Sequence, residues 1–202
     1  MNTIQAVVWD MGGVLIRTED RHPRAALAAE YGLTYEMLES IVYGSRTAVE
    51  ASVGHITAET HWKSVQALLK ISDDALPRFK HEFWAGDVCD TDLVTRINNL
   101  RPEIKTGLLS NAWDDARTGV GAQYPFLQVF DVSVFSAEIK LAKPDHAIFQ
   151  WMLDQLNLPA EQTIFVDDMA ENVNAAKAVG MQAIRFQTRD QVIQELQAYL
   201  PF

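Results

Sequence analysis

Ile4-Gln-Ala-Val-Val-Trp-Asp-Met-Gly-Gly-Val-Leu15 is the stretch from which the fold of this chain follows. Its first residues form a mostly apolar run of strand length, which ends at Asp10, just before the pair Gly12-Gly13. In open parallel sheets, ligands bind outside the carboxyl ends of the strands. The stretch therefore predicts a carboxylate at a ligand-binding edge, although a single run of this kind is also typical of a strand that ends in a plain turn.

Two later runs of strand length end in polar side chains in the same way. Because the carboxyl ends of parallel strands meet at one edge of a sheet, we expect these polar groups to lie near Asp10. The runs and their endings are residues 105–109 with Ser110-Asn111, and residues 163–166 with Asp167-Asp168.

A lysine lies between these two runs in the sequence. Lys143 precedes Pro144, and Asp145 is suited to cap a helix that begins near His146. A lysine before a proline is common, so its significance depends on the strand ends that precede and follow it.

The pattern over the rest of the chain predicts an α/β protein with a doubly wound parallel sheet, because strand-like runs alternate with amphipathic helices. Gly180 is in the usual position to end one of these helices. The expected strands include residues 132–136 and 182–186, and the expected helices are residues 90–100, 146–156, 172–179 and 190–200.

Residues 24–83 have helical periodicity and no convincing strand. A helix start is expected at Thr57, and another at residues 72–75, because a hydroxyl followed by acidic residues suits the amide end of a helix. This predicts a helical block inserted directly after the first strand.

Composition limits the classes of function. The 202 residues, 48% of them hydrophobic, can bury a core with a modest insertion, and the net charge of -10 argues against binding nucleic acid or an anionic membrane. The lone Cys89 excludes an internal disulfide and is expected to pack. With no leader-like start and no long apolar run, we expect a cytoplasmic protein, its oligomeric state left open.

In this order, Asp10, Ser110, Lys143 and Asp167-Asp168 resemble the four motifs of the haloacid dehalogenase-like superfamily, mostly magnesium-dependent phosphatases with an aspartate nucleophile. The resemblance covers almost the whole chain. It implies a Rossmann-like core of residues 1–16 and 90–202 with an inserted helical cap of residues 17–89. Residues 44–62 also resemble caps of the subgroup with sugar-phosphate phosphatases and the phosphatase domain of epoxide hydrolases.

The resemblance implies a role for each residue of the acidic site. Asp10 would be the nucleophile, and Mg²⁺ would be bound by Asp10, the backbone carbonyl of Gly12 and Asp168. Asp167 would lie beside these ligands, and Asn172 would either orient the acidic pair or cap its helix. The residues themselves support a metal, because adjacent carboxylates repel each other unless a cation or a proton intervenes, and magnesium prefers oxygen ligands.

The remaining motif residues have the phosphoryl group as their common target. Lys143 would compensate the charges of the phosphate and Asp10, as a catalytic and phosphate-binding residue. Ser110 and the backbone amide of Asn111 would donate hydrogen bonds to the phosphoryl oxygens. The implied function is a phosphatase for a small phosphorylated metabolite, with a sugar phosphate as one candidate.

Gly12 departs from the family pattern, because most of these phosphatases have a second aspartate there as general acid. Such help is typically worth about 10²- to 10⁴-fold in rate. Glu19, Asp20 or His55 would have to replace it, or the substrate has a good leaving group, or turnover is slow. We favour the good leaving group as a hypothesis.

Two other functions compete with the phosphatase. A 2-haloacid dehalogenase typically has tyrosine in place of Gly12 and serine-asparagine in place of Asp167-Asp168, and this chain has neither. A phosphate-binding or regulatory protein would keep the pocket but lose turnover. Specificity is expected in cap-side residues facing Asp10, with these candidates: Arg17, Tyr43, Arg46, His55 and Trp113.

Overall fold

A five-stranded parallel sheet forms the centre of the computed structural model, which describes residues 3–200. The strand order is β5-β4-β1-β6-β7, so β1 pairs with β4 on one side and with β6 on the other. The carboxyl ends of these three strands are therefore neighbours. The strands are β1 (Ala6–Trp9), β4 (Lys105–Ser110), β5 (Val132–Phe135), β6 (Thr163–Asp167) and β7 (Gln182–Arg185).

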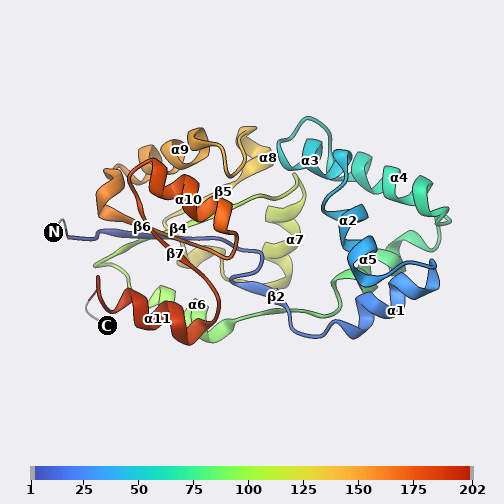
Figure 1. Ribbon diagram of the computed structural model, residues 1–202, viewed down its shortest axis with the longest axis horizontal. Coiled ribbons are helices and arrows are strands. Elements are labelled where there is room, and N and C mark those ends of the chain that lie inside the picture. The colour runs from blue at the N-terminus through green and yellow to red at the C-terminus, as the bar shows by residue number, and fades with distance from the viewer. Residues whose placement is uncertain (1–2, 201–202) are drawn as a thin grey trace.

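Helices cover both faces of this sheet (Figure 1). Successive side chains of a strand point to opposite faces, so Val7 and Trp9 join one apolar cluster while Ala6 and Val8 join the other. The first cluster includes α6 (Thr91–Asn98) and α11 (Arg189–Leu196), and the second includes α9 (His146–Leu156) and α10 (Ala170–Ala178). The doubly wound α/β fold predicted from the sequence is confirmed.

The segment after the first strand folds into helices around an apolar cluster of its own, which includes Leu38, Trp62 and Phe79. The sequence predicts the start of α4 correctly, since the Thr57 hydroxyl accepts a hydrogen bond from the Thr60 amide at 3.1 Å. These helices are α1 (His22–Glu30), α2 (Tyr35–Val42), α3 (Arg46–Ser52), α4 (Ala58–Leu69) and α5 (Leu76–Trp84).

One predicted helix start in this segment is wrong. The residues from Ser72 to Ala75 form a turn, in which the Ala75 amide donates to the Ser72 carbonyl, and α5 begins only at Leu76. The proline in the first turn of α5 explains the later start, because its fixed φ and missing N–H suit the first helical positions.

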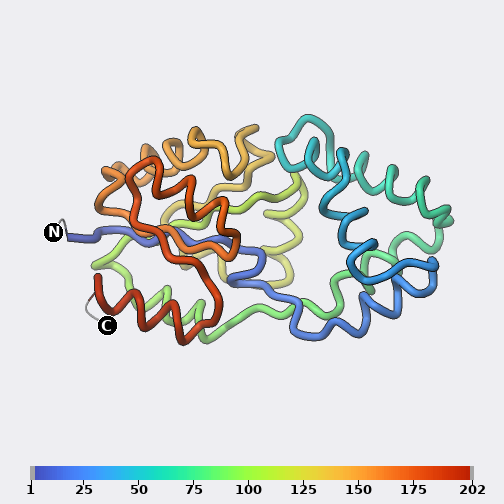
Figure 2. Tube along the Cα trace, in the orientation of Figure 1, coloured from blue at the N-terminus to red at the C-terminus, as the bar shows by residue number. Residues whose placement is uncertain are grey.

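Two short strands connect the helices to the sheet, and the sequence pattern does not predict them. β2 (Ile16–Thr18) and β3 (Asp87–Cys89) pair antiparallel, and Figure 2 shows the two segments running side by side. A Cβ at Gly86 would lie 1.8 Å from the Asp20 carbonyl oxygen, so only glycine permits this approach. Strands of three residues are too short for an alternating pattern to be recognised.

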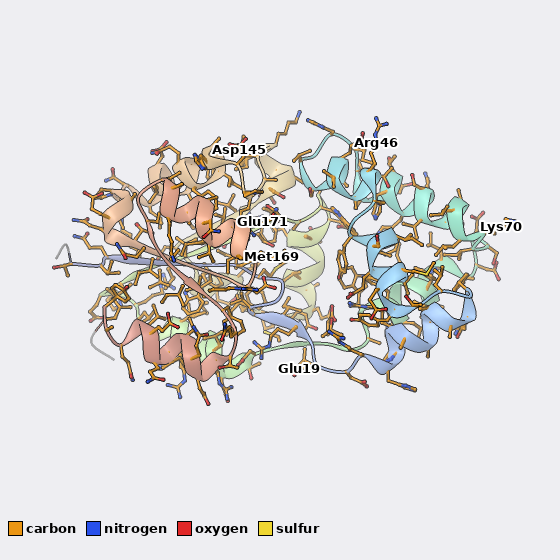
Figure 3. All side chains as sticks on the ribbon, in the orientation of Figure 1. Glu19, Arg46, Lys70, Asp145, Met169 and Glu171 are labelled. Atoms are coloured by element: carbon orange, nitrogen blue, oxygen red, sulfur yellow. The ribbon has the colours of Figure 1, made fainter. Side chains whose placement is uncertain are left out.

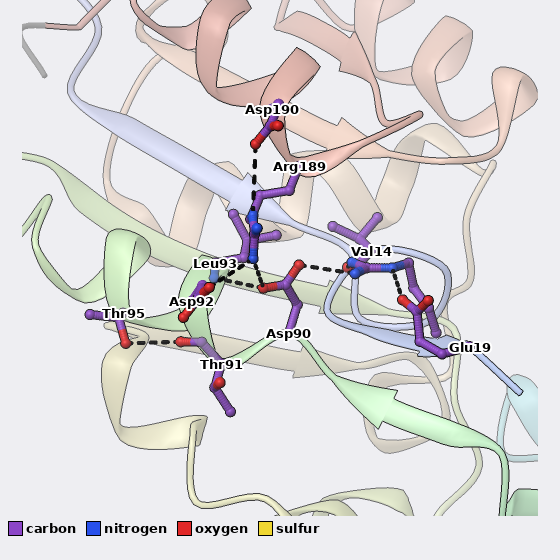
Figure 4. Close-up of polar contacts among 10 residues, drawn as sticks. Val14, Glu19, Asp90, Thr91, Asp92, Leu93, Thr95, Arg189 and Asp190 are labelled. Atoms are coloured by element: carbon purple, nitrogen blue, oxygen red, sulfur yellow. Dashed lines mark hydrogen bonds and ion pairs between the residues drawn. The ribbon is translucent and has the colours of Figure 1, made fainter.

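Asp90 ties these two connections to the sheet domain (Figure 4). Its carboxylate accepts hydrogen bonds from the Leu93 amide at 2.9 Å, from Arg17 at 2.9 Å and from Arg189 at 3.2 Å. Arg17 also donates to the Val14 carbonyl at 2.6 Å. Arg17 therefore holds the first connection in place.

The remaining differences from the predicted elements are small. The strand expected at residues 132–136 ends at Phe135, because Ser136 begins α8 (Ser136–Ile139). The sequence pattern also misses α7 (Ala116–Gln123) and two short 3-10 helices, Leu127–Val129 and Ala160–Gln162. Half-buried Cys89 packs against the cluster that includes Trp9. Within residues 3–200, no helix has the length and apolar character needed to span a bilayer.

Candidate active site

The polar residues predicted to meet at the sheet edge do so in the structure. Asp10 directly follows β1, while Ser110 and Asp167 are the last residues of β4 and β6, the two neighbours of β1. Lys143 comes from the connection between α8 and α9 and reaches the same point. Chain segments far apart in sequence thus converge on Asp10.

Lys143 is a buried cation between two carboxylates. Its Nζ lies 2.8 Å from Asp10 Oδ1 and 2.7 Å from Asp167 Oδ2. Burial alone would lower the pKa of Lys143, but the two carboxylates outweigh it and raise the pKa above its usual value. The lysine therefore supplies a fixed positive charge beside Asp10.

Asp10 is held in one orientation, but nearby positive charge does not fully offset the cost of burying its carboxylate. Its Oδ1 accepts a hydrogen bond from the Met11 amide at 2.7 Å and also contacts Lys143. Burial raises the pKa of Asp10 to about 7, an effect that Lys143 opposes and the Asp167 charge reinforces. Among residues 3–200, the hydrogen bond to Asp10 from the Met11 amide and its ion-pair contact with Lys143 at 2.8 Å both use Oδ1.

Asp167 is the fully buried member of the acidic pair. Asn172 Nδ2 donates to both of its carboxylate oxygens at 3.1 Å, and the Met169 amide donates to Oδ1 at 2.8 Å. Of the two roles considered for Asn172, the structure favours orienting the acidic pair, since α10 begins after Met169 without a side-chain cap.

Asp168 completes a cluster suited to a metal ion. Asp10, Asp167 and Asp168 each offer an oxygen, and these oxygens all lie within 4.8 Å of one another. Burial and the Asp167 charge raise the pKa of Asp168, and Lys143 bonds to the other two acids only. A cluster of hard oxygen ligands that is short of positive charge fits Mg²⁺.

The glycine pair leaves room around this cluster. A Cβ at Gly13, where φ is +77°, would lie 2.5 Å from Asp168 Oδ2, so a side chain there would displace that carboxylate. Gly12 is exposed, and a Cβ added to it would meet nothing within 4 Å. Gly12 therefore leaves open space where a side chain would otherwise lie.

Asn111 has a role that sequence reasoning misses. Its side chain donates to the Lys143 carbonyl and accepts from the Lys143 amide, both at 2.8 Å, and so holds the lysine segment against the end of β4. Ser110, next to Asn111, is buried at the strand end.

The suggested replacements for a general acid have other partners or are exposed. Glu19 pairs with Arg17, Asp20 accepts a hydrogen bond from the His22 amide, and His55 is exposed. In the part of the chain that the structure describes, none of these candidates is bonded to Asp10.

A family model described as haloacid dehalogenase-like hydrolase matches residues 4–180. Drimenol cyclase of Aspergillus calidoustus is 35% identical over 96% of this chain, which spans only 36% of that protein. Sesquiterpene phosphatase of Aspergillus oryzae is 47% identical over 26% of this chain and 27% of its own length. Phosphorylated carbohydrates phosphatase of Thermotoga maritima is 38% identical over 27% of this chain and 26% of its own length.

Solved structures show the same fold at low sequence identity. A HAD family enzyme of Bacteroides thetaiotaomicron, in complex with magnesium and inorganic phosphate, superposes with a TM-score of 0.76 at 22% identity and covers 92% of this chain and 96% of its own. L-2-haloacid dehalogenase of Xanthobacter autotrophicus superposes with a TM-score of 0.68 at 18% identity and covers 98% of this chain and 85% of its own. With the family match over residues 4–180, these findings place the chain among the haloacid dehalogenase-like hydrolases.

Proposed function

We propose that this protein is a magnesium-dependent phosphatase that hydrolyses a small phosphorylated metabolite through an aspartyl-phosphate intermediate. The observation that carries the proposal is the oriented Asp10 carboxylate, in contact with buried Lys143 and next to the acidic pair Asp167-Asp168. We also propose that residues 17–89 act as a cap on a core formed by residues 1–16 and 90–202.

In this mechanism Asp10 attacks the phosphorus atom, preferentially through Oδ2, since Oδ1 is held by Lys143 and the Met11 amide. The bond from Asp10 to phosphorus forms as the bond to the leaving oxygen breaks, and that oxygen takes a proton from solvent. Lys143 and the donors at Ser110 and Asn111 would hold the phosphoryl oxygens during transfer. Water then hydrolyses the aspartyl phosphate and releases inorganic phosphate.

Asp10, Asp168 and the Gly12 carbonyl would hold the magnesium ion. When bound, the ion supplies positive charge that offsets the repulsion between the carboxylates and an anionic substrate. Asp167, bonded to Lys143 and Asn172, would keep these groups in position.

Two kinds of substrate are suggested by the relatives. One relative is named for a sesquiterpene phosphate and another for phosphorylated carbohydrates, and the second agrees with a sugar phosphate as the candidate. The dehalogenase alternative has less support, because such enzymes lack the acidic pair at Asp167-Asp168.

The first test measures phosphate release from p-nitrophenyl phosphate with magnesium and with a chelator. We expect magnesium-dependent turnover by the wild type, and turnover lowered by more than about 10⁴-fold in Asp10→Asn, which removes the nucleophile. Asp190→Asn, at a side chain that is 95% exposed, is the matched control and should behave as wild type. Folded protein that binds phosphate and magnesium without turnover would instead identify a binding or regulatory protein.

A second test concerns the missing general acid. Gly12→Asp places a carboxylate in open space, so we expect it to raise the rate on alkyl phosphates by about 10²-fold or more and to change p-nitrophenyl phosphate little. Gly119→Asp, which also meets nothing within 4 Å, is the control. Equal rates of wild type on good and poor leaving groups would contradict the leaving-group hypothesis.

A further inference from the structure

Large apolar side chains follow both of the strands that flank Asp10. Met169 comes directly after Asp168 at the end of β6 and is 48% exposed. Trp113 follows the end of β4 by three residues and is half-buried. Figure 3 places Met169 at the end of the sheet domain that is nearest helices α1–α5. The carboxylate thus lies between two segments that each present an apolar group.

Trp113 contacts aromatic residues of the helical segment. Its ring centroid lies 4.6 Å from that of His61, 5.7 Å from that of Trp62 and 6.4 Å from that of Tyr43. Tyr43 in turn lies 5.7 Å from half-buried Trp84 and remains 44% exposed. We call Tyr43, Trp84 and Trp113 the aromatic wall, because they join the strand end to the cap helices in one contiguous surface.

A cation beside this wall, Arg24, is already paired through all three of its guanidinium nitrogens. Arg24 lies 5.9 Å from the Tyr43 ring and donates to the Phe83 carbonyl, Glu39 and Asp87 at 2.7–3.0 Å. Its guanidinium is buried. Binding an anionic or hydroxylated group here would require breaking these bonds in a buried place, which is unfavourable.

Two further polar groups beside the wall, the His61 ring and the Trp113 indole N–H, are also engaged within the protein. The two ring nitrogens of His61 lie 2.9 Å from the Thr47 hydroxyl and 2.9 Å from the Val42 carbonyl. The Trp113 Nε1–H donates to the Ala48 carbonyl at 3.3 Å. Sugar hydroxyls placed against these engaged groups would lose hydrogen bonds to water without gaining these partners. A hydrocarbon has no such hydrogen bonds to lose.

We propose that the substrate is a phosphate monoester whose organic group is apolar, a hydrocarbon or aromatic group that lies against the aromatic wall and Met169. This inference rests on the proposed phosphatase site, and it selects the apolar class over phosphorylated sugars. The aromatic rings supply rigid apolar area, and the flexible methionine adapts to the shape of the group.

The test uses alkylphosphonates, which bind without being hydrolysed, as inhibitors of p-nitrophenyl phosphate turnover. From methyl- to octylphosphonate, we expect the inhibition constant to fall by roughly two- to fourfold per methylene that reaches the wall. Propylphosphonate should bind more tightly than its 2,3-dihydroxypropyl counterpart, although both carry the same phosphonate and the same number of carbons. Equal or weaker inhibition by the longer chains would overturn the inference.

Matched variants identify the surface. Tyr43→Ala and Met169→Ser should each raise the inhibition constant of octylphosphonate by about tenfold and leave that of methylphosphonate unchanged. Tyr199→Ala, at a tyrosine 45% exposed, and Met37→Ser, at a methionine 50% exposed, are controls and should change neither. If Tyr43→Ala weakened inhibition by every phosphonate to the same extent, the cause would be a folding defect rather than a lost contact. In that case, Met169→Ser protein that was inhibited by octylphosphonate as strongly as the wild type would overturn the proposal.

Calorimetric binding of the same phosphonates in magnesium separates this proposal from the phosphatase itself. If the wild type lacks turnover but binds longer chains more tightly, the proposed function fails and the apolar ligand class stands. If turnover is present without preference for long chains, the proposed function stands and the apolar class is wrong.

Discussion

Two buried cations, one in the sheet domain and one among helices α1–α5, are paired in similar ways but with different consequences. Each is almost fully buried and each contacts two carboxylates within 3.0 Å. The pairs are Lys143 with Asp10 and Asp167, and Arg24 with Glu39 and Asp87.

The difference between them lies in what surrounds the pair. Arg24 also donates to the Phe83 carbonyl and lies 4.3 Å from the Phe83 ring centroid, so its surroundings are closed. Lys143 faces a third acid nearby, Asp168, which it does not contact and which is only half-buried. A buried ion pair is therefore compatible with either a structural or a ligand-binding role. An additional accessible carboxylate beside the pair favours the ligand-binding role.

The largest expected effect is on the closed pair. Arg24→Met leaves Asp87, whose side chain is 10% exposed, without its cation, and we expect the free energy of unfolding to fall by about 3–5 kcal/mol. Arg46→Met, at a side chain that is 90% exposed and pairs within one helix, should cost less than about 1 kcal/mol. Urea denaturation of both variants measures this, and a similar small loss in both would remove the distinction.

The open pair should respond mainly in rate. Lys143→Met removes the charge beside Asp10, and we expect kcat to fall by about 10²- to 10³-fold in protein whose circular dichroism is that of wild type. Lys177→Met, at an exposed lysine of α10, serves as the control. If Lys143→Met unfolds the protein while retaining turnover per folded molecule, Lys143 is structural and the comparison fails.

A smaller effect is expected at the residue that orients Asp167. Asn172→Ala removes two hydrogen bonds to that carboxylate, so the magnesium concentration for half-maximal activity should rise by about 10- to 100-fold. Asn174→Ala alters the same helix at an exposed position and should leave the magnesium dependence unchanged. A magnesium dependence unchanged in Asn172→Ala would mean that Asp167 needs no such support.

The smallest effect concerns a buried group that stays neutral. Burial lowers the pKa of His61, so below about pH 6.5 the unfolded chain binds a proton that the folded protein does not. Stability should therefore be lost as pH falls through this range, by at most about 1.4 kcal/mol per pH unit. Denaturation at pH 7.5, 6.5 and 5.5 should show a shallower loss in His61→Gln than in wild type or in exposed His81→Gln, and parallel curves would contradict it.

The strand ends were predictable because their signals are local. A buried strand of a parallel sheet is a short apolar run, and a polar residue at its end stands out, as at Asp10 and Asp167. The short strands β2 and β3 were not predictable, because Ile16–Thr18 and Asp87–Cys89 have partners 69 or more residues apart and too few residues to show a period.

The sequence by itself determined the α/β fold, the helical insertion and the set of polar residues at the strand ends, because periodicity and turn chemistry act between residues close in the chain. Only the tertiary structure decided that Asn111 holds the Lys143 segment, that the partners of Arg24 enclose its guanidinium, and that the rings of Trp113 and Tyr43 pack together. These contacts join distant segments, and their side chains look ordinary in sequence. Their roles depend on which groups packing brings within hydrogen-bonding or van der Waals distance.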